Sequence, residues 1–118
     1  MTKEARTDKQ FLLDIIDAIE SVDEFLLDQT KAEFENNYML QSAVIRQFEI
    51  IGEAAGKLSR GLTTSHREID WHKVTGMRHK MIHDYFEVSI DVVWNTIQED
   101  LPILIRQIKK ILEEEGNA

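Results

Sequence analysis

Apolar residues recur every three or four positions along most of the chain, which is the spacing of a helix that buries one stripe. The first such run begins at Asp8, a residue type that can cap a helix. Acidic residues occupy its other side. Its apolar positions are Phe11, Leu12, Ile15, Ile16, Ile19, Val22, Phe25 and Leu26. The pattern predicts a helix that weakens in the polar residues 28–31.

A second helix is predicted from about residue 37 to residue 60, and it contains Gly52 and Gly56. Each glycine costs about 1 kcal/mol relative to alanine in an exposed helix interior, so we expect close packing against another helix to compensate. Glu49 is expected to face solvent, whereas Glu53, beside this small-residue patch, is a candidate to face the next helix. The apolar positions are Leu40, Ala43, Val44, Phe48, Ile50, Ile51, Ala54, Ala55 and Leu58.

Residues 61–65 form the clearest predicted loop, because a glycine is followed by small polar residues. A third helix should begin after Asp70, its N-cap, and the glycine at position 76 again suggests a closely packed neighbour. Ser89 is the expected cap of the next helix. Pro102 should kink or break this helix near residues 100–102, before a last run with Ile103, Leu104, Ile108, Ile111 and Leu112.

No segment shows the alternation of a strand, so the pattern predicts an all-α protein, an antiparallel bundle of four or five helices. The 118 residues fit a single domain spanning 1–118. Hydrophobic and charged contents of 42% and 31% are typical of a globular protein in solution. The absence of cysteine excludes disulfides and thiolate chemistry. Because the first residues are polar and no apolar run reaches about 20 residues, we expect a cytoplasmic protein without a membrane segment.

The charge distribution singles out one part of the chain. The net charge of −8 argues against a general nucleic-acid binder. Residues 54–83 nevertheless carry six basic and two acidic residues together with all four histidines, and the segments on either side are acidic. This is either the ordinary unevenness of helical faces or a local anion site on an acidic body.

The basic region contains Arg78, His83 and Tyr85, which form an Arg-x4-His-x-Tyr pattern. At about 100° per residue, Arg78 and His83 lie roughly 140° apart and flank one helix. Two copies of the helix at a dimer axis would bring four cationic groups into one cleft. On the same helix Val74, Met77, Met81 and Tyr85 share the expected core face, and His72, His79 and His83 share another.

These residue types suit metal-independent cleavage of RNA. Arginine is always charged and holds a phosphate through two hydrogen bonds. Histidine titrates near neutral pH and can take the proton of a 2′-hydroxyl that attacks the adjacent phosphorus. An arginine and a histidine five residues apart are common in helices, so the spacing alone is weak support.

Two other interpretations fit the same residues. His79 and His83 have the i, i+4 spacing that lets two imidazoles share one metal ion, although Lys80 between them is a poor neighbour for a cation, and a solvated or core-edge histidine pair also fits. Tyr85 is either a core aromatic residue or an exposed hydroxyl that a modifying enzyme could reach. A nucleotide added there would block the site by charge and bulk.

Three segments together resemble one family. They are residues 50–55 (IIGEAA), residues 71–78 (WHKVTGMR) leading into the arginine–histidine–tyrosine pattern, and residues 91–94 (DVVW) followed by 99–102 (EDLP). In this order they are similar to the HepT-like toxins, all-helical ribonucleases of the HEPN superfamily. The resemblance extends from about residue 8 to residue 112.

The resemblance implies a homodimer whose two motifs line a shared cleft and cleave RNA without a metal or another cofactor. It implies that Arg78 and His83 are the catalytic pair. It also implies a partner, a minimal nucleotidyltransferase antitoxin that transfers AMP to Tyr85. His79, where the family often has asparagine, is a candidate supporting residue, as are Lys80 and Glu53. The alternative is a non-catalytic helical dimer that binds and regulates a nucleotidyltransferase.

Overall fold

The computed structural model describes residues 5–83 and 89–116, with side chains described for 5–78 and 89–115. Within these residues the chain is helical and contains no strand, so the predicted all-α class is confirmed. The elements are α1 (Asp8–Phe25), α2 (Lys31–Glu35), α3 (Tyr38–Gly56), α4 (Arg60–Ser65), α5 (Trp71–His83), α6 (Ile90–Asn95), the π-helical turn η1 (Thr96–Asp100) and α7 (Leu101–Gly116).

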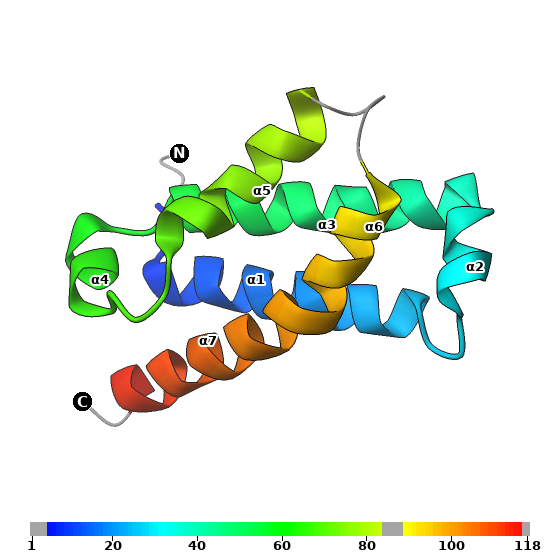
Figure 1. Cartoon of the computed structure of the whole chain (residues 1–118). Helices are drawn as coiled ribbons and strands as arrows, with labels where there is room; N and C mark the ends of the chain where they lie inside the picture. The colour runs from blue at the N-terminus through cyan, green and yellow to red at the C-terminus, as the bar shows by residue number, and fades with distance from the viewer. Residues whose placement is uncertain (1–4, 84–88, 117–118) are drawn as a thin grey trace, which may run out of the picture.

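Four helical rods form the bundle: α1, α3, α5 and the continuous run of α6, η1 and α7 (Figure 1). Successive rods run in opposite directions, α3 packs against both α1 and α5, and α7 packs against α1. The apolar stripes predicted from the sequence meet in one core, which includes Ile15, Val22, Phe48, Ile51 and Ile108. None of the described helices combines the length and the apolar character needed to cross a bilayer.

The start of α1 differs from the prediction, because Thr7 caps the helix and Asp8 is its first residue. Thr7 and Gln10 form a reciprocal capping box, in which each side chain accepts a hydrogen bond from the other residue's backbone N–H. The carboxylate of Asp8 is left free to accept hydrogen bonds from the backbone N–H (2.8 Å) and the hydroxyl of Ser59. Asp8 therefore joins the first turn of α1 to the start of α4.

The predicted weak point at residues 28–31 is confirmed, and it leads into the short helix α2. Asp28 lies in the turn that follows α1 and has a positive φ of 62°. The buried ring of Phe34 lies with its centroid 5.7 Å from that of Trp94, and Lys31 forms an ion pair with Asp91 at 2.6 Å. Both contacts hold the start of the last rod against α2.

The prediction of a loop at residues 61–65 is wrong, since they belong to α4. The hydroxyl of Ser59 accepts a hydrogen bond from the backbone N–H of Leu62 at 3.2 Å, which caps the helix. The side chain of Leu62 is buried in the core. The cap and this one apolar contact outweigh the poor helix propensity of the surrounding glycine and threonine residues.

The last rod also differs in detail. Ser89 caps α6 as predicted, but the chain does not break at Pro102. The π-helical turn η1 comes directly before α7, and such a wider turn relieves the clash that a proline ring makes with the preceding turn. Ile103, the first apolar residue of the last predicted run, is 50% exposed. The altered helical geometry therefore lies one turn earlier than the sequence indicated.

Candidate functional site

Helix α5, which carries the arginine–histidine pattern, is fixed at its first turn. Asp70 accepts a hydrogen bond from the backbone N–H of Lys73 at 3.1 Å, which confirms it as the N-cap. The indole N–H of Trp71 donates to the backbone carbonyl of His66 at 3.0 Å. These two bonds set where α5 begins and which way it faces.

The rotation of α5 is set by its apolar side chains. Val74 and Met77 are buried, as their predicted place on the core face requires. Arg78, the next residue, consequently points away from the core, and its side chain is exposed. Met81 and Tyr85, the other predicted members of the core face, lie outside the described side chains.

The backbone of Arg78 packs directly against Gly52 of α3. A Cβ atom at position 52 would lie 2.5 Å from the Cβ of Arg78 and 2.6 Å from its backbone nitrogen. Carbon atoms in ordinary contact are about 3.5–4.0 Å apart, so no residue larger than glycine fits without a shift of one helix. The predicted close approach at Gly52 is therefore confirmed, and its partner is the arginine of the motif.

The other two glycines for which close packing was predicted show no such approach to the described atoms. A Cβ atom at Gly56 would meet only the Cγ2 of Thr75, at 4.0 Å, and one at Gly76 would meet no described atom within 4 Å. Gly52 alone among these three positions is required by a neighbouring helix.

Glu53 lies on α3 beside this contact, but its carboxylate pairs with Lys57 at 3.3 Å. Both residues line a hollow of about 190 Å³ with Phe11 of α1. Glu49 similarly pairs with Arg46 at 3.4 Å. Among the described side chains, no carboxylate lies within ion-pair distance of Arg78. The expectation that Glu53 supports the site stays a prediction.

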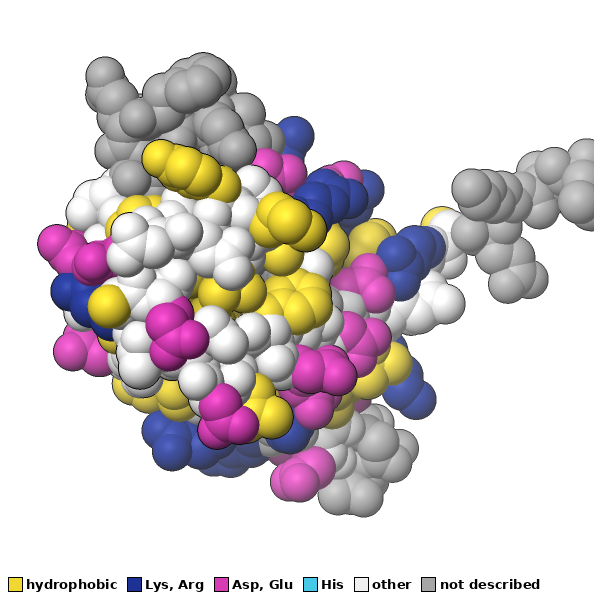
Figure 2. Space-filling model, turned by 90° about the vertical axis from the view of Figure 1, so that its right-hand side faces the viewer, with side chains coloured by type: hydrophobic (Ala, Val, Ile, Leu, Met, Phe, Trp, Pro, Cys, Tyr) yellow, Lys and Arg dark blue, Asp and Glu magenta, His cyan; other side chains and the backbone are white. Residues whose placement is uncertain are grey.

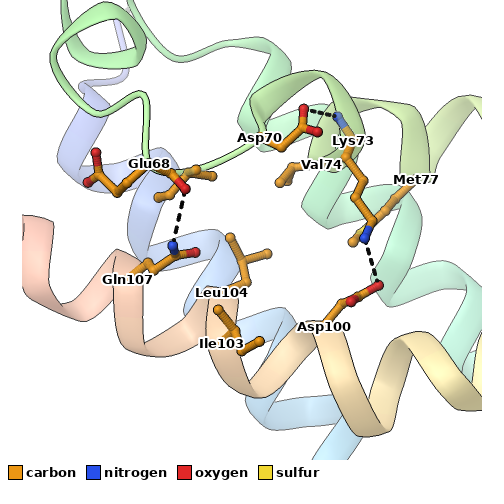
Figure 3. A pocket seen from close by; sticks show the side chains of 10 residues that line it. Glu68, Asp70, Lys73, Val74, Met77, Asp100, Ile103, Leu104 and Gln107 are labelled. Carbon is orange, nitrogen blue, oxygen red and sulfur yellow. Dashed lines mark hydrogen bonds and ion pairs between the residues drawn. The ribbon is translucent and has the colours of Figure 1, made fainter.

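A second hollow, of about 220 Å³, lies between α5 and α7 (Figure 3). Lys73 forms an ion pair with Asp100 at 3.2 Å across one side, and the amide of Gln107 donates to the carbonyl of Glu68 at 3.4 Å across the other. Sequence reasoning missed both contacts, because each joins segments far apart in the chain. They hold α5 to the last rod at the end opposite His83.

His79, Lys80 and His83 belong to the helical backbone of α5, but their side chains are outside the described part of the structure. On an ideal helix His83 follows Arg78 by about 7.5 Å along the axis. The described residues contain no group of three or more histidine, aspartate or glutamate side chains placed to hold a metal ion. His79 and His83, on which the metal interpretation rests, lie outside the described side chains.

The fold and the site thus define an all-helical bundle. In it, α5 packs closely on Gly52 of α3 and exposes the side chain of Arg78 to solvent. A family model described as Ribonuclease HepT-like matches residues 15–111, and the chain belongs to this family. The predicted enzyme class is thereby confirmed at the level of a ribonuclease family. The membership also confirms the family resemblance of the sequence.

Relatives of known name agree with this assignment. A protein of Thermococcus cleftensis named "Probable ribonuclease HepT" is 40% identical over 106 residues, which cover 90% of this chain and 96% of the relative. A provisionally named RNase of Caldanaerobacter subterraneus subsp. tengcongensis is 38% identical over 96 residues, 78% of this chain and 86% of the relative. Another provisionally named RNase, from Methanocaldococcus jannaschii, is 35% identical over 106 residues, which cover 90% of this chain and 91% of the relative. No solved structure matches this chain significantly.

Proposed function

We propose that this protein is a metal-independent endoribonuclease that acts as the toxin of a toxin–antitoxin system in the cytoplasm. The observation that carries the proposal is the close packing of Arg78 on Gly52. This contact fixes the backbone of a residue whose guanidinium group faces solvent. A preorganised cation of this kind stabilises charge that develops on a phosphate during reaction. Family membership supplies the reaction class, and the names of the relatives point to RNA as substrate.

In the proposed reaction His83 removes the proton of a 2′-hydroxyl. The 2′-oxygen forms a bond to the adjacent phosphorus while the bond from phosphorus to the 5′-oxygen breaks. The leaving 5′-oxygen takes a proton from a second imidazolium, and a 2′,3′-cyclic phosphate remains. Arg78 pairs with the non-bridging oxygens, on which negative charge increases. No step requires a metal ion.

A homodimer supplies the second histidine in this proposal. Arg78 and His83 lie about 140° apart around an ideal helix, so one copy of α5 cannot direct both toward one phosphate easily. Two copies of α5 that face each other across a two-fold axis line one cleft with two arginines and two histidines. His79 and Lys80 add further positive charge there, and Glu53 lies next to Gly52, on which Arg78 packs.

Tyr85 is the proposed site of control. A minimal nucleotidyltransferase antitoxin would transfer AMP to its hydroxyl, and the added phosphate would lie two residues from His83 in the sequence. The negative charge would pair with the cations that bind RNA and exclude the substrate. The intact mass of protein co-produced with such a partner should increase by whole AMP units, and Tyr85→Phe should abolish the increase.

The proposed activity is tested with purified protein and single-stranded RNA in excess EDTA. Cleavage should continue in EDTA, and Arg78→Ala and His83→Ala should each lower the rate at least about 100-fold. Arg78→Lys should restore little, because lysine cannot make the paired contact. Arg106→Ala, which removes an exposed arginine of α7, is the matched control and should cleave at the wild-type rate. Full activity of Arg78→Ala and His83→Ala would refute the assignment.

The second candidate function is the non-catalytic helical dimer that regulates a nucleotidyltransferase, and the strongly acidic body of the chain favours it mildly. It predicts that Arg78→Ala and His83→Ala retain every cellular effect of the wild type. Loss of growth arrest together with loss of cleavage would exclude it.

A further inference from the structure

Gly76 is a helical glycine that the packing of the described residues does not explain. It lies in the interior of α5, where glycine costs about 1 kcal/mol relative to alanine. A Cβ atom there would meet no described atom within 4 Å. On an ideal helix Gly76 falls within about 60° of His72, His79 and His83, on the side of α5 directed away from the core. The row of side chains along this side is therefore interrupted at Gly76.

The interruption at Gly76 lets another molecule approach the backbone of α5 closely, which is a common use of glycine. His72 and Lys73, both exposed, lie within one turn of it, and Arg78 lies two residues further on. Cationic and N–H-bearing side chains beside bare backbone suit the phosphate chain of a nucleic acid. A single RNA strand bound at Arg78 can therefore cross α5 at Gly76.

The hollow between α5 and α7 lies on the flank of α5 that such a strand would reach. Lys73 and Met77 line it, and on an ideal helix Lys73 is about 140° from Arg78. Figure 3 shows Lys73 extending from α5 toward Asp100 at one side of the hollow. An α-helix with its side chains is about 10–12 Å across, so the hollow is a few nucleotides from a phosphate held by Arg78.

The size and the floor of the hollow suit one flat ring. Its volume is about 220 Å³, whereas pockets for drug-sized ligands have about 300–1,000 Å³. Val74, Met77 and Leu104 line it, and the side chains of all three are buried. An apolar floor with a polar rim is the usual construction of a small-ligand site. Among the parts of a nucleotide, the base fits this construction.

The rim of the hollow decides which part of a nucleotide can enter it. Glu68, Asp70 and Asp100 contribute carboxylates, and Lys73, the one cation of the lining, is already paired with Asp100 at 3.2 Å. Carboxylates repel a phosphate but accept hydrogen bonds from amino groups. Adenine, cytosine and guanine carry an exocyclic amino group, whereas uracil has a carbonyl oxygen in its place.

From this arrangement we infer that the hollow between α5 and α7 binds one amino-bearing base of the RNA substrate, a few nucleotides from the scissile bond. The strand crosses α5 at Gly76, and Asp100 accepts a hydrogen bond from the amino group of the base. Single-stranded RNA is recognised in this way by other proteins, through bases that are turned out and read at their edges. The inference deepens the proposed function and rests on it, because it describes a subsite for the same substrate.

The opposite end of the molecule is unsuited to the strand. Figure 2 looks onto the end formed by α2 and the start of α3, where hydrophobic side chains reach the surface among acidic ones. Glu24, Glu33 and Glu35 are exposed there. An acidic surface repels a phosphate chain. Helix α5 begins at the other end of the molecule, near α4, and its first turns offer the strand cations instead (Figure 1).

The first test measures binding, by fluorescence anisotropy, of a short 2′-O-methyl RNA that lacks the attacking hydroxyl. An abasic nucleotide is moved along the strand one position at a time. At one position the loss of the base should raise the Kd of the wild type about tenfold, and uracil there should bind nearly as weakly. Asp100→Asn should bind the intact strand about tenfold more weakly, and loss of the same base should then add little. Glu99→Gln changes the charge equally outside the hollow and should respond to base loss as the wild type does.

The second test compares cleavage of a longer RNA with cleavage of a ribodinucleotide, which is too short to reach the hollow. Gly76→Ala should lower kcat/KM for the longer RNA at least about tenfold more than for the ribodinucleotide, because its methyl group obstructs the crossing strand. Equal losses on both substrates would indicate a displaced Arg78 or a contact with a second copy, and would overturn the crossing at Gly76.

The two tests separate this inference from the proposed reaction. If no base position matters for binding, or if Asp100→Asn responds to base loss as the wild type does, the hollow is not a base site, whether or not RNA is cleaved. A wild type that cleaves neither substrate would reject the ribonuclease, and the anisotropy measurements would still decide the role of the hollow.

Discussion

Replacement of Gly52 by alanine tests whether close packing of α3 on α5 holds Arg78 in place. The new methyl group would lie 2.5 Å from the Cβ of Arg78 and 2.6 Å from its backbone nitrogen. The nitrogen is backbone and cannot rotate away, so the two helices must separate by about 1 Å to restore a normal contact.

The magnitude follows from two opposing terms. Alanine gains up to about 1 kcal/mol over glycine in helix propensity. Overpacking costs about 1–3 kcal/mol, and we expect about 2–3 kcal/mol here because the methyl group meets backbone that cannot rotate away. We therefore expect Gly52→Ala to lower the free energy of unfolding by about 1–2 kcal/mol, measured by urea denaturation with the slope of the transition compared to the wild type. If the protein is a dimer, both proteins must be compared at one concentration.

Gly76→Ala is the matched control, because it lies in the interior of α5 and its added methyl would meet no described atom within 4 Å. It should raise the free energy of unfolding by up to about 1 kcal/mol. The two substitutions are chemically identical and should have opposite signs. A Gly52→Ala protein as stable as the wild type, or more stable, would refute the close contact with Arg78.

Further predictions concern contacts away from the motif. Phe34→Ala should lower the free energy of unfolding by about 3–5 kcal/mol in urea, because it removes a fully buried ring that packs on Trp94. Asp8→Ala should cost about 1–2 kcal/mol by the same assay, since two hydrogen bonds to Ser59 are lost, and Lys9→Ala is a nearby control expected to change little. Partial desolvation of its carboxyl group, followed by repulsion from Glu20, raises the pKa of Asp23 above its ordinary value of 3.8. The folded state then binds this proton more tightly than the unfolded state, so its contribution to stability falls as the pH rises from 3.8 through the raised value. Asp23→Asn should make the urea midpoint depend less on pH across that interval. A variant whose midpoint changes with pH as the wild type's does would contradict the assignment.

The helical pattern was readable from the sequence because one stripe of each long helix is buried and the caps are local. Asp70 and Ser89 cap their helices as predicted, since a cap depends only on the next few residues. The start of α1 was missed by one residue, because Gln10 gives Thr7 a reciprocal partner. The helix α4 was missed because its one stabilising apolar contact, made by Leu62, is tertiary.

The candidate site could be predicted only in part for a similar reason. The sequence predicts a close approach at Gly52, but the spacing of residues around a glycine does not show which residue packs against it. The ion pair of Lys73 with Asp100 depends on where the π-helical turn ends, and a proline predicts a disturbance without giving its form. Glu53 was expected to turn toward α5, and the structure gives it a partner, Lys57, on its own helix.

Helix α3 connects these observations because it packs against both α1 and α5. One side of the helix lies on α1 in the core, and Gly52, on another side, packs against the backbone of Arg78. Since both contacts are made by one helix and a close-packed interior transmits strain, a core substitution that shifts α3 on α1 should also move the backbone of Arg78 without touching it.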